Sequence, residues 1–136
     1  MAQLPIARGL LLCEKFIVEE RTHNVSLINC FTHRVAPSFP TEPQQFVIYS
    51  ALANGLGTIR LGIGISRLAT SESVYERAAT VRFTDLLQEV RFTYRVTSCV
   101  FPGPGDYEVL LAADGEFITQ TRFTLIQRSD QHERRD

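Results

Sequence analysis

The sequence lacks most of the features that mark specialised classes of protein. It contains no tryptophan and only three cysteines, and its formal net charge is -1 over 136 residues. This near-neutral charge argues against nucleic-acid binding by bulk electrostatics, because such domains usually carry a clear basic excess. No stretch approaches the roughly 20 apolar residues that a membrane helix requires. These absences predict a soluble protein with neither a nucleic-acid nor a membrane partner.

The cysteines, Cys13, Cys30 and Cys99, are sparse and odd in number, whereas small secreted domains carry an even disulfide framework. We therefore predict reduced thiols in a cytoplasmic protein; one disulfide with a free third thiol is the alternative. The short apolar run 9–12 before Cys13 is interpreted as part of a first strand. It is too short for a signal peptide, and Leu12 is too bulky for the cleavage site.

Alternation with a period of two residues dominates the chain and is typical of half-buried strands. The clearest case is a set of four aliphatic residues at every second position: Ile59, Leu61, Ile63 and Ile65. Asp114-Gly115 stands between two such segments, where a tight hairpin needs residues that accept positive φ. We predict eight strands, over residues 9–19, 24–35, 45–53, 57–68, 74–84, 89–100, 106–113 and 116–127.

Eight short strands separated by turn signals predict an all-β fold, an immunoglobulin-like antiparallel β-sandwich of seven to nine strands. Residues 1–128 form one domain in this prediction, residues 85–88 cross between the sheets, and the polar tail 129–136 is disordered. The predicted core consists of the inward apolar residues: Leu12, Phe16, Val18, Leu27, Phe46, Ile48, Ile59, Leu61, Ile63, Val81, Phe83, Phe92, Tyr94, Val96, Tyr107, Val109, Leu111, Phe123 and Leu125.

Motifs for catalysis and metal binding are weak. Zinc sites usually show paired ligands at close spacing, and here one Cys-x-x-His, Cys30 to His33, has no second pair in sequence. If the first two strands form a hairpin, Cys13, His23, Cys30 and His33 could meet at a metal or a Cys-dependent active site. We expect instead that the cysteines are structural, and we predict no enzyme activity and no cofactor.

One surface pattern favours a protein partner. On three predicted strands, arginine and other polar residues occupy alternate positions and so share one face of the strand. The candidate interaction face consists of Arg82, Arg91, Thr93, Arg95 and Arg122. This face exists only if the three strands share one sheet. Arginine is favoured at interfaces because its planar fork makes several directed hydrogen bonds. A solvated sheet face with threonine chosen for β-propensity is the alternative.

Glycine at two alternate positions of one strand, Gly62 and Gly64, has two interpretations. The glycines could leave a flat groove for a ligand or a partner backbone, or they could mark a bend or a tightly packed neighbour. We expect the second.

Several short segments together resemble an uncharacterised bacterial family of small single-domain proteins, a domain of unknown function. They are Cys13-Glu-Lys-Phe, Ser26-Leu-Ile-Asn-Cys-Phe-Thr, Phe39-Pro-Thr, Val74-Tyr-Glu-Arg, Pro104-Gly-Asp-Tyr-Glu-Val and Asp114-Gly-Glu. The resemblance implies a compact β-sandwich from a bacterial cytoplasm and supplies no site residues.

The leading functional hypothesis is a non-enzymatic interaction or scaffold module that binds an unidentified protein partner or itself. An exposed edge strand of a sandwich is a ready surface for such pairing. The first alternative is a small-ligand binder that uses the end loops 36–44 and 54–57. The second is the metal or Cys-dependent site described above.

Overall fold

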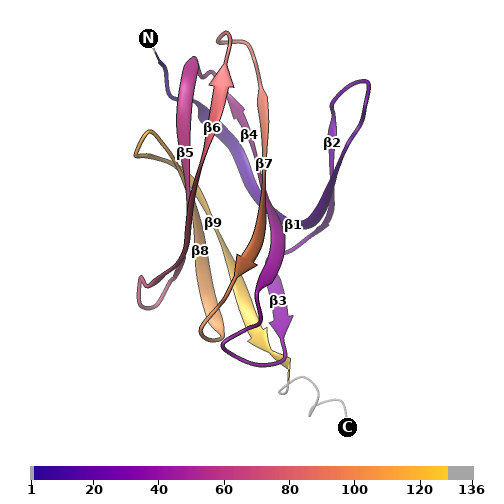
Figure 1. Ribbon diagram of the computed structural model, residues 1–136, viewed down its shortest axis with the longest axis vertical. Helices are drawn as coiled ribbons and strands as arrows, with labels where there is room; N and C mark the ends of the chain where they lie inside the picture. Colours follow the sequence, from indigo (N-terminus) through magenta and orange to yellow (C-terminus); the bar gives the residue numbers. More distant parts are fainter. Residues whose placement is uncertain (1, 129–136) are drawn as a thin grey trace.

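The computed structural model describes residues 2–128, and within this range the chain forms nine strands in two sheets (Figure 1). Their bounds are β1 Ile6–Val18, β2 Val25–Cys30, β3 His33–Ala36, β4 Gln44–Ala53, β5 Gly57–Arg67, β6 Ser73–Phe83, β7 Val90–Cys99, β8 Gly105–Ala113 and β9 Glu116–Gln127. The all-β fold class is confirmed. The predicted tail 129–136 lies outside the described residues.

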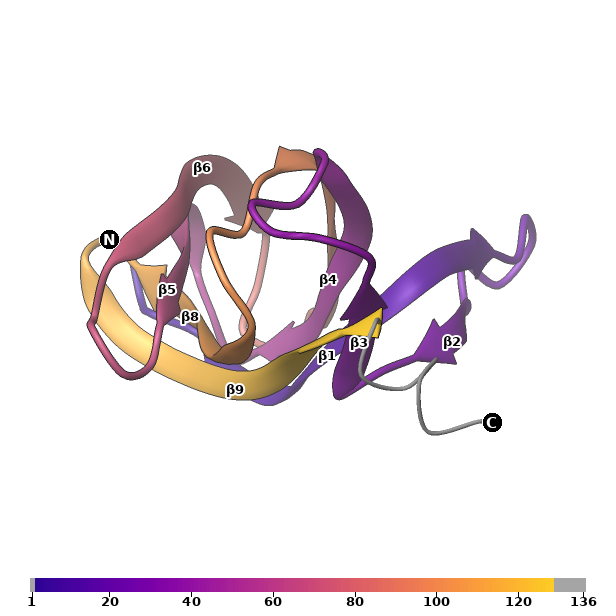
Figure 2. The ribbon, with the colours of Figure 1, turned by 90° about the horizontal axis from the view of Figure 1, so that it is seen from below.

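The two sheets form the layers of a sandwich around one core (Figure 2). One sheet has the order β2-β1-β4-β7 and the other has the order β3-β9-β8-β5-β6. Every pair of neighbouring strands is antiparallel except β3 and β9, which run parallel. The prediction of a wholly antiparallel sandwich is therefore wrong at this one pair.

The predicted strand 24–35 is two strands, because the chain changes sheets at Phe31 and Thr32. The residues before this point pair with β1, and those after it pair with β9. No glycine or proline lies between residues 24 and 36, so the sequence carries no turn signal at the crossing. The predicted crossing at residues 85–88 is confirmed, since it joins β6 in one sheet to β7 in the other.

The hairpin between β8 and β9 has the predicted turn. Asp114 and Gly115 have φ values of 47° and 86°. The Asp114 carboxylate accepts a hydrogen bond of 3.0 Å from the backbone N–H of Arg60, which ties the turn to β5. The role of this aspartate is therefore structural.

Aromatic rings fill one end of the core. Phe101 packs edge-on against Tyr107, with 4.9 Å between ring centroids, and Tyr107 stacks with Phe123 at 5.6 Å. The buried Tyr107 hydroxyl donates to the backbone oxygen of Gly103 at 2.7 Å, so its polar atom has a partner.

The predicted core is confirmed at most positions and wrong at three. Phe16 and Leu27 are half-buried and Val18 is 46% exposed. All three belong to a part of β1 and β2 that no second sheet covers, and this part carries the candidate site.

Candidate interaction site on the β1–β2 arm

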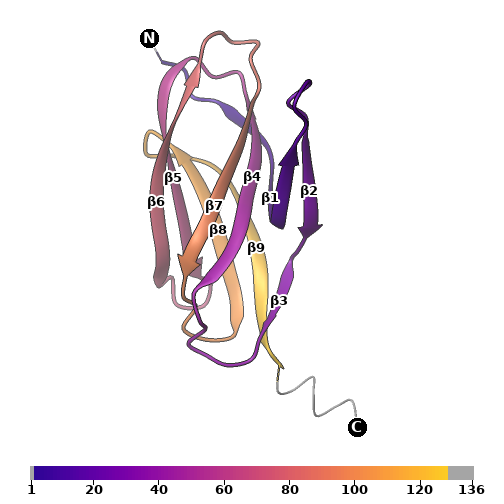
Figure 3. The ribbon, with the colours of Figure 1, turned by 45° about the vertical axis from the view of Figure 1, so that its right-hand side comes forward.

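The end of β1 and the whole of β2 leave the body of the sandwich as a two-stranded ribbon. Strand β1 pairs with β4 only as far as Cys13, and beyond this residue it pairs with β2 alone. Figures 1 and 3 show the ribbon standing away from both sheets, with β2 on the outside. We call residues 14–29, which comprise the ribbon and its turn, the arm.

Large apolar side chains are exposed on both strands of the arm. Ile17 is 56% exposed, Val18 46% and Ile28 40%, and Val25 is half-buried beside them. Ile17 and Ile28 lie on one face of the ribbon, and Val18 and Val25 lie on the other. A two-stranded ribbon is marginally stable by itself, so these exposed apolar residues make the arm a candidate interaction site.

Four strands lie at sheet edges: β2, β3, β6 and β7. Proteins protect such edges against unwanted pairing with charged side chains, proline or bulges. Three of the four follow this rule, through Arg34 on β3, Glu76, Arg77 and Arg82 on β6, and Arg91 and Arg95 on β7. Strand β2, with the sequence Val-Ser-Leu-Ile-Asn-Cys, contains no charged residue, no proline and no shift of register. Among residues 2–128, no strand pairs with its outer edge.

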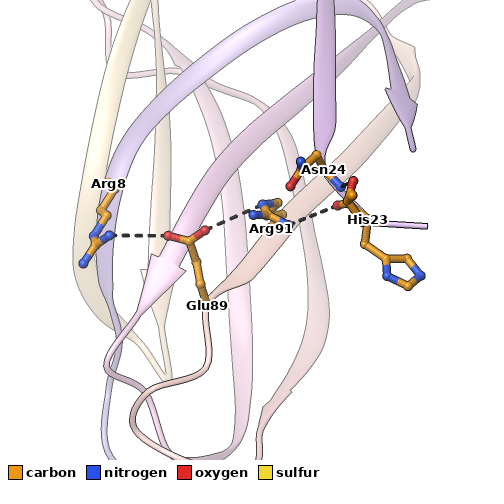
Figure 4. Close-up of polar contacts among 6 residues, drawn as sticks. Arg8, His23, Asn24, Glu89 and Arg91 are labelled. Carbon is orange, nitrogen blue, oxygen red and sulfur yellow. Dashed lines mark hydrogen bonds and ion pairs between the residues drawn. The ribbon is translucent and has the colours of Figure 1, made fainter. Parts of the chain in front are cut away.

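Two of the predicted interface arginines hold the arm in place. The Arg95 guanidinium lies 5.4 Å from the centroid of the Phe16 ring. Arg91 donates a hydrogen bond of 3.1 Å from Nη1 to the backbone oxygen of His23, in the turn of the arm (Figure 4). Glu89 supports Arg91 at 3.6 Å and also contacts Arg8 on β1 at 3.5 Å. The arm is therefore fixed to β7 at its base and its tip.

The turn of the arm is ordered by a carboxylate. Glu19 accepts hydrogen bonds from the backbone N–H groups of Arg21, at 3.0 Å, and Thr22, at 2.9 Å. Both bonds favour the charged carboxylate and so lower the pKa of Glu19, and the bond from Arg21 has the larger effect. His23 completes the turn with a positive φ of 60°.

The predicted arginine and threonine face does not form one surface. Arg91, Thr93 and Arg95 lie on β7 in the four-stranded sheet, whereas Arg82 on β6 and Arg122 on β9 lie in the five-stranded sheet. The predicted face required all three strands to lie in one sheet, and they do not. Parity within a strand determines which side a residue faces, but it does not determine which sheet the strand joins. Arg122 instead lies 3.9 Å from Glu108 on the neighbouring strand.

The four residues of the possible metal site do not converge. Cys13 and Cys30 are direct partners in the register of β1 and β2. His23 lies in the turn beyond the Val18–Val25 pair, five residue pairs away, which corresponds to about 17 Å. His33 belongs to β3 in the other sheet. No group of three or more His, Cys, Asp or Glu side chains with metal-binding geometry occurs among the described residues.

A groove, the interpretation of Gly62 and Gly64 that we did not favour, is present as a shallow trough on the outer face of the five-stranded sheet. Its lining includes Glu76, Leu110 and Ala112, and its volume is about 210 Å³. A Cβ atom at either glycine would meet no atom within 4 Å, and neither φ is positive. The tightly packed neighbour, one of the two expected explanations, is therefore wrong.

The two end loops proposed for a small ligand are closed against the sandwich. In loop 36–44, Thr41 exchanges hydrogen bonds with the backbone of Phe101. In loop 54–57, a Cβ on Gly55 would lie 2.8 Å from the Phe83 ring.

The arm was missed as a site, although its signal is in the sequence. Residues 25–30 combine β-branched and aliphatic residues with a complete lack of charge. We interpreted this composition as core, because a buried strand and an unprotected edge have the same appearance.

Comparisons with known proteins add a family and little else. The model of DUF6941, described as a family of unknown function, matches residues 8–126, in agreement with the predicted resemblance. No curated protein matches the chain. A solved structure of β-glucosidase from Listeria innocua in complex with isofagomine is similar at 9% identity and a TM-score of 0.43, over 88% of this chain and 16% of that chain. Within residues 2–128 there is no helix long and apolar enough to span a membrane.

Proposed function

Because the chain belongs to DUF6941, a family of unknown function, we propose a function from its own geometry: it is a protein-interaction module that self-associates through β2. The observation that carries the proposal is the uncharged and unpaired outer edge of β2 on a projecting arm. The exposed Ile17, Val18 and Ile28 add apolar area beside this edge. We keep the predicted cytoplasmic location as part of the proposal, since the cysteines are few and odd in number.

A second copy of the chain fits this edge better than it fits the other three. In a two-fold dimer residue i of the strand faces residue j of its copy and j faces i, so every charge on the strand is brought into the contact twice. Self-pairing of β6 or β7 would bring arginines together, whereas self-pairing of β2 brings together only uncharged side chains. The four-stranded sheet would then continue from one copy into the next.

The hydrogen-bonding pattern identifies the backbone groups that would make this contact. The N–H of Glu19 donates to the oxygen of Asn24 at 2.8 Å, so the neighbouring Val18 and Val25 form a non-hydrogen-bonded pair. Pairs alternate along an antiparallel ladder, and this alternation holds as far as Asn29, where φ is 57°. The N–H and C=O groups of Val25 and Leu27 therefore point away from β1, toward the free edge.

The arm needs little reorganisation to accept a partner. Arg91 and Arg95 hold its tip and its base, and Glu19 orders its turn. A binding edge that is already ordered loses less conformational entropy on association than a mobile one.

The test is the concentration dependence of the molecular mass, measured by sedimentation equilibrium on the full chain. We expect the wild type to associate reversibly. Leu27→Pro should give a monomer, because proline removes an outward N–H while leaving the bonds to β1 intact. Ile28→Lys should also give a monomer, because it places a charge on the edge.

Val100→Lys is the matched control, since Val100 is 43% exposed and Ile28 is 40% exposed. This variant should associate like the wild type, and thermal unfolding should show that all three variants are folded. A wild type that stays monomeric at every concentration contradicts the proposal. So does an association that Leu27→Pro and Ile28→Lys leave unchanged.

A further inference from the structure

The fold places two of the three cysteines opposite each other in one hairpin. Cys13 on β1 and Cys30 on β2 are register partners, and both are free thiols. Side chains of directly opposed residues in antiparallel strands share a face, with Cβ atoms about 4.5–5.5 Å apart. Within the described residues, Cys99 has no such partner, because its register partner on β4 is Gln44.

The backbone at this pair has the geometry that a disulfide requires. The bond from the Phe31 N–H to the Leu12 oxygen flanks the pair and makes it a non-hydrogen-bonded one. The Cα atoms of such a pair are about 4.5 Å apart, the closer of the two spacings in an antiparallel ladder. Disulfides span Cα separations of about 4.4–6.8 Å. The two sulfurs can therefore be joined without moving either strand.

The two thiols differ in accessibility in a way that suits a stepwise oxidation. Cys13 is fully buried, and its thiol donates to the backbone oxygen of Lys15 at 3.2 Å. Burial, and then the neighbouring Cys30, raise the pKa of Cys13. Cys30 is exposed and lines a cavity of about 160 Å³ with Leu10, Leu12 and Thr121 among its neighbours. An external reagent can reach Cys30 directly, whereas it cannot reach Cys13.

We propose that Cys13 and Cys30 form a reversible cross-strand disulfide by exchange with a small-molecule disulfide such as oxidised glutathione. In the first step the Cys30 thiolate attacks one sulfur of the reagent, which breaks the reagent's S–S bond, forms a mixed disulfide and releases one small thiol. In the second step Cys13 leaves its contact with Lys15, loses its proton and attacks the Cys30 sulfur. This step forms the Cys13–Cys30 bond and releases the second small thiol.

The exchange is balanced in atoms and electrons. The two cysteine thiols are oxidised to one disulfide, the reagent disulfide is reduced to two thiols, and the two protons from the cysteines end on those thiols. A reducing thiol in excess reverses both steps.

The disulfide would lie at the base of the arm and enclose residues 14–29 in a covalent loop. The two strands of the arm could then no longer separate. This inference goes beyond the proposed self-association and does not depend on it, because the exchange takes place within one chain.

The experiment uses the full chain with oxidised glutathione, followed by alkylation of the remaining thiols under denaturing conditions and measurement of the intact mass. The wild type should lose two hydrogens and keep one alkylated thiol, that of Cys99. Cys99→Ser should lose two hydrogens and keep none. Cys13→Ser should stop as a glutathione adduct on Cys30, because the second thiol is missing, and Cys30→Ser should not react while folded.

Cys13→Ala repeats the test without a hydroxyl at the buried position and should give the same adduct as Cys13→Ser. Dithiothreitol should restore three free thiols in the wild type. A wild type that stops at the glutathione adduct overturns the inference, because its Cys13 would then be unable to reach Cys30. A wild type that keeps three free thiols overturns it as well, and so does a disulfide that involves Cys99.

Discussion

Replacing Gly62 and Gly64 by alanine should stabilise the protein. Both residues are in the interior of β5, where glycine has no side chain to pack and costs more conformational entropy on folding than alanine does. A Cβ at either position meets no atom within 4 Å, and neither residue has a positive φ. Alanine therefore introduces no clash and no backbone strain, and it reduces the conformational freedom of the unfolded chain.

The size of the effect follows from these two observations. A compatible glycine-to-alanine change raises the free energy of unfolding by about 0.4–1 kcal/mol. The two methyl groups would be about 7 Å apart along the strand and would not touch, so the double variant should gain about 1–2 kcal/mol. In a domain of this size, 1 kcal/mol corresponds to a change of about 3–5 °C in Tm.

Gly55→Ala is the control, because the same chemical change meets a different environment. Its Cβ would lie 2.8 Å from two carbon atoms of the Phe83 ring. Phe83 is only 1% exposed and belongs to the core, so the ring cannot move aside freely. Overpacking of this kind costs about 1–3 kcal/mol. The two substitutions should therefore have opposite signs.

Urea denaturation followed by circular dichroism, with thermal unfolding as a second measurement, checks both signs. The m-value should stay constant, so that a shift of the midpoint reports stability. A loss of stability in Gly62→Ala or Gly64→Ala would refute the reasoning, since it requires a contact at the trough that residues 2–128 do not supply. Equal effects of Gly55→Ala and Gly62→Ala would refute it too.

Two further predictions concern the arm. Arg95→Ala removes the cation–π contact with Phe16, which is worth about 0.5–1 kcal/mol at an exposed site. Hydrogen exchange of the arm amides should therefore accelerate by about two- to five-fold. Arg82→Ala, on the other sheet, is the control and should leave this exchange unchanged. Acid should loosen the turn. The folded pKa of Glu19 is lowered from 4.5, so its contribution is complete above that value and disappears as the pH falls through the lower folded pKa. Amide exchange at Arg21 and Thr22 should follow this pH profile in the wild type, and Glu19→Gln should show none of it.

Strand positions and the turn between β8 and β9 could be predicted from sequence because they depend on local chemistry. Alternation places a side chain on one face or the other within a single strand, and Asp114-Gly115 supplies the positive φ values of its turn without help from distant residues. Pairing is a different matter. Residues 24–36 leave one sheet and enter the other without a glycine or a proline to mark the crossing, so the parallel pair of β3 and β9 has no local signature.

Three residues of the arm were predicted to belong to the core, again because alternation is a local signal. Phe16, Val18 and Leu27 alternate like core residues, and alternation says that a face is apolar without saying what covers it. Here β1 runs past the end of its pairing with β4, and within residues 2–128 the other sheet does not extend over the ribbon that follows. The predicted arginines show the converse: Arg91 and Arg95 matter for the position of the arm and do not form a surface with Arg82 or Arg122.

A strand without charged residues indicates a binding edge only once the topology shows that the strand lies at the edge of a sheet. In the middle of a sheet, the segment Val25 to Cys30 would be an ordinary buried strand, because its backbone groups would be paired on both sides. At an edge the same residues leave a row of N–H and C=O groups open to any strand of matching length. The other edge strands carry arginines, whereas β2 carries only uncharged residues. Protection is thus absent at one edge of four, and this edge stands farthest from the core. An edge strand that lacks protective charges and has no partner exposes a protein to aggregation. An edge that binds a partner strand, in contrast, must be free of such charges. The uncharged edge of β2 therefore favours the proposal that it binds a partner strand.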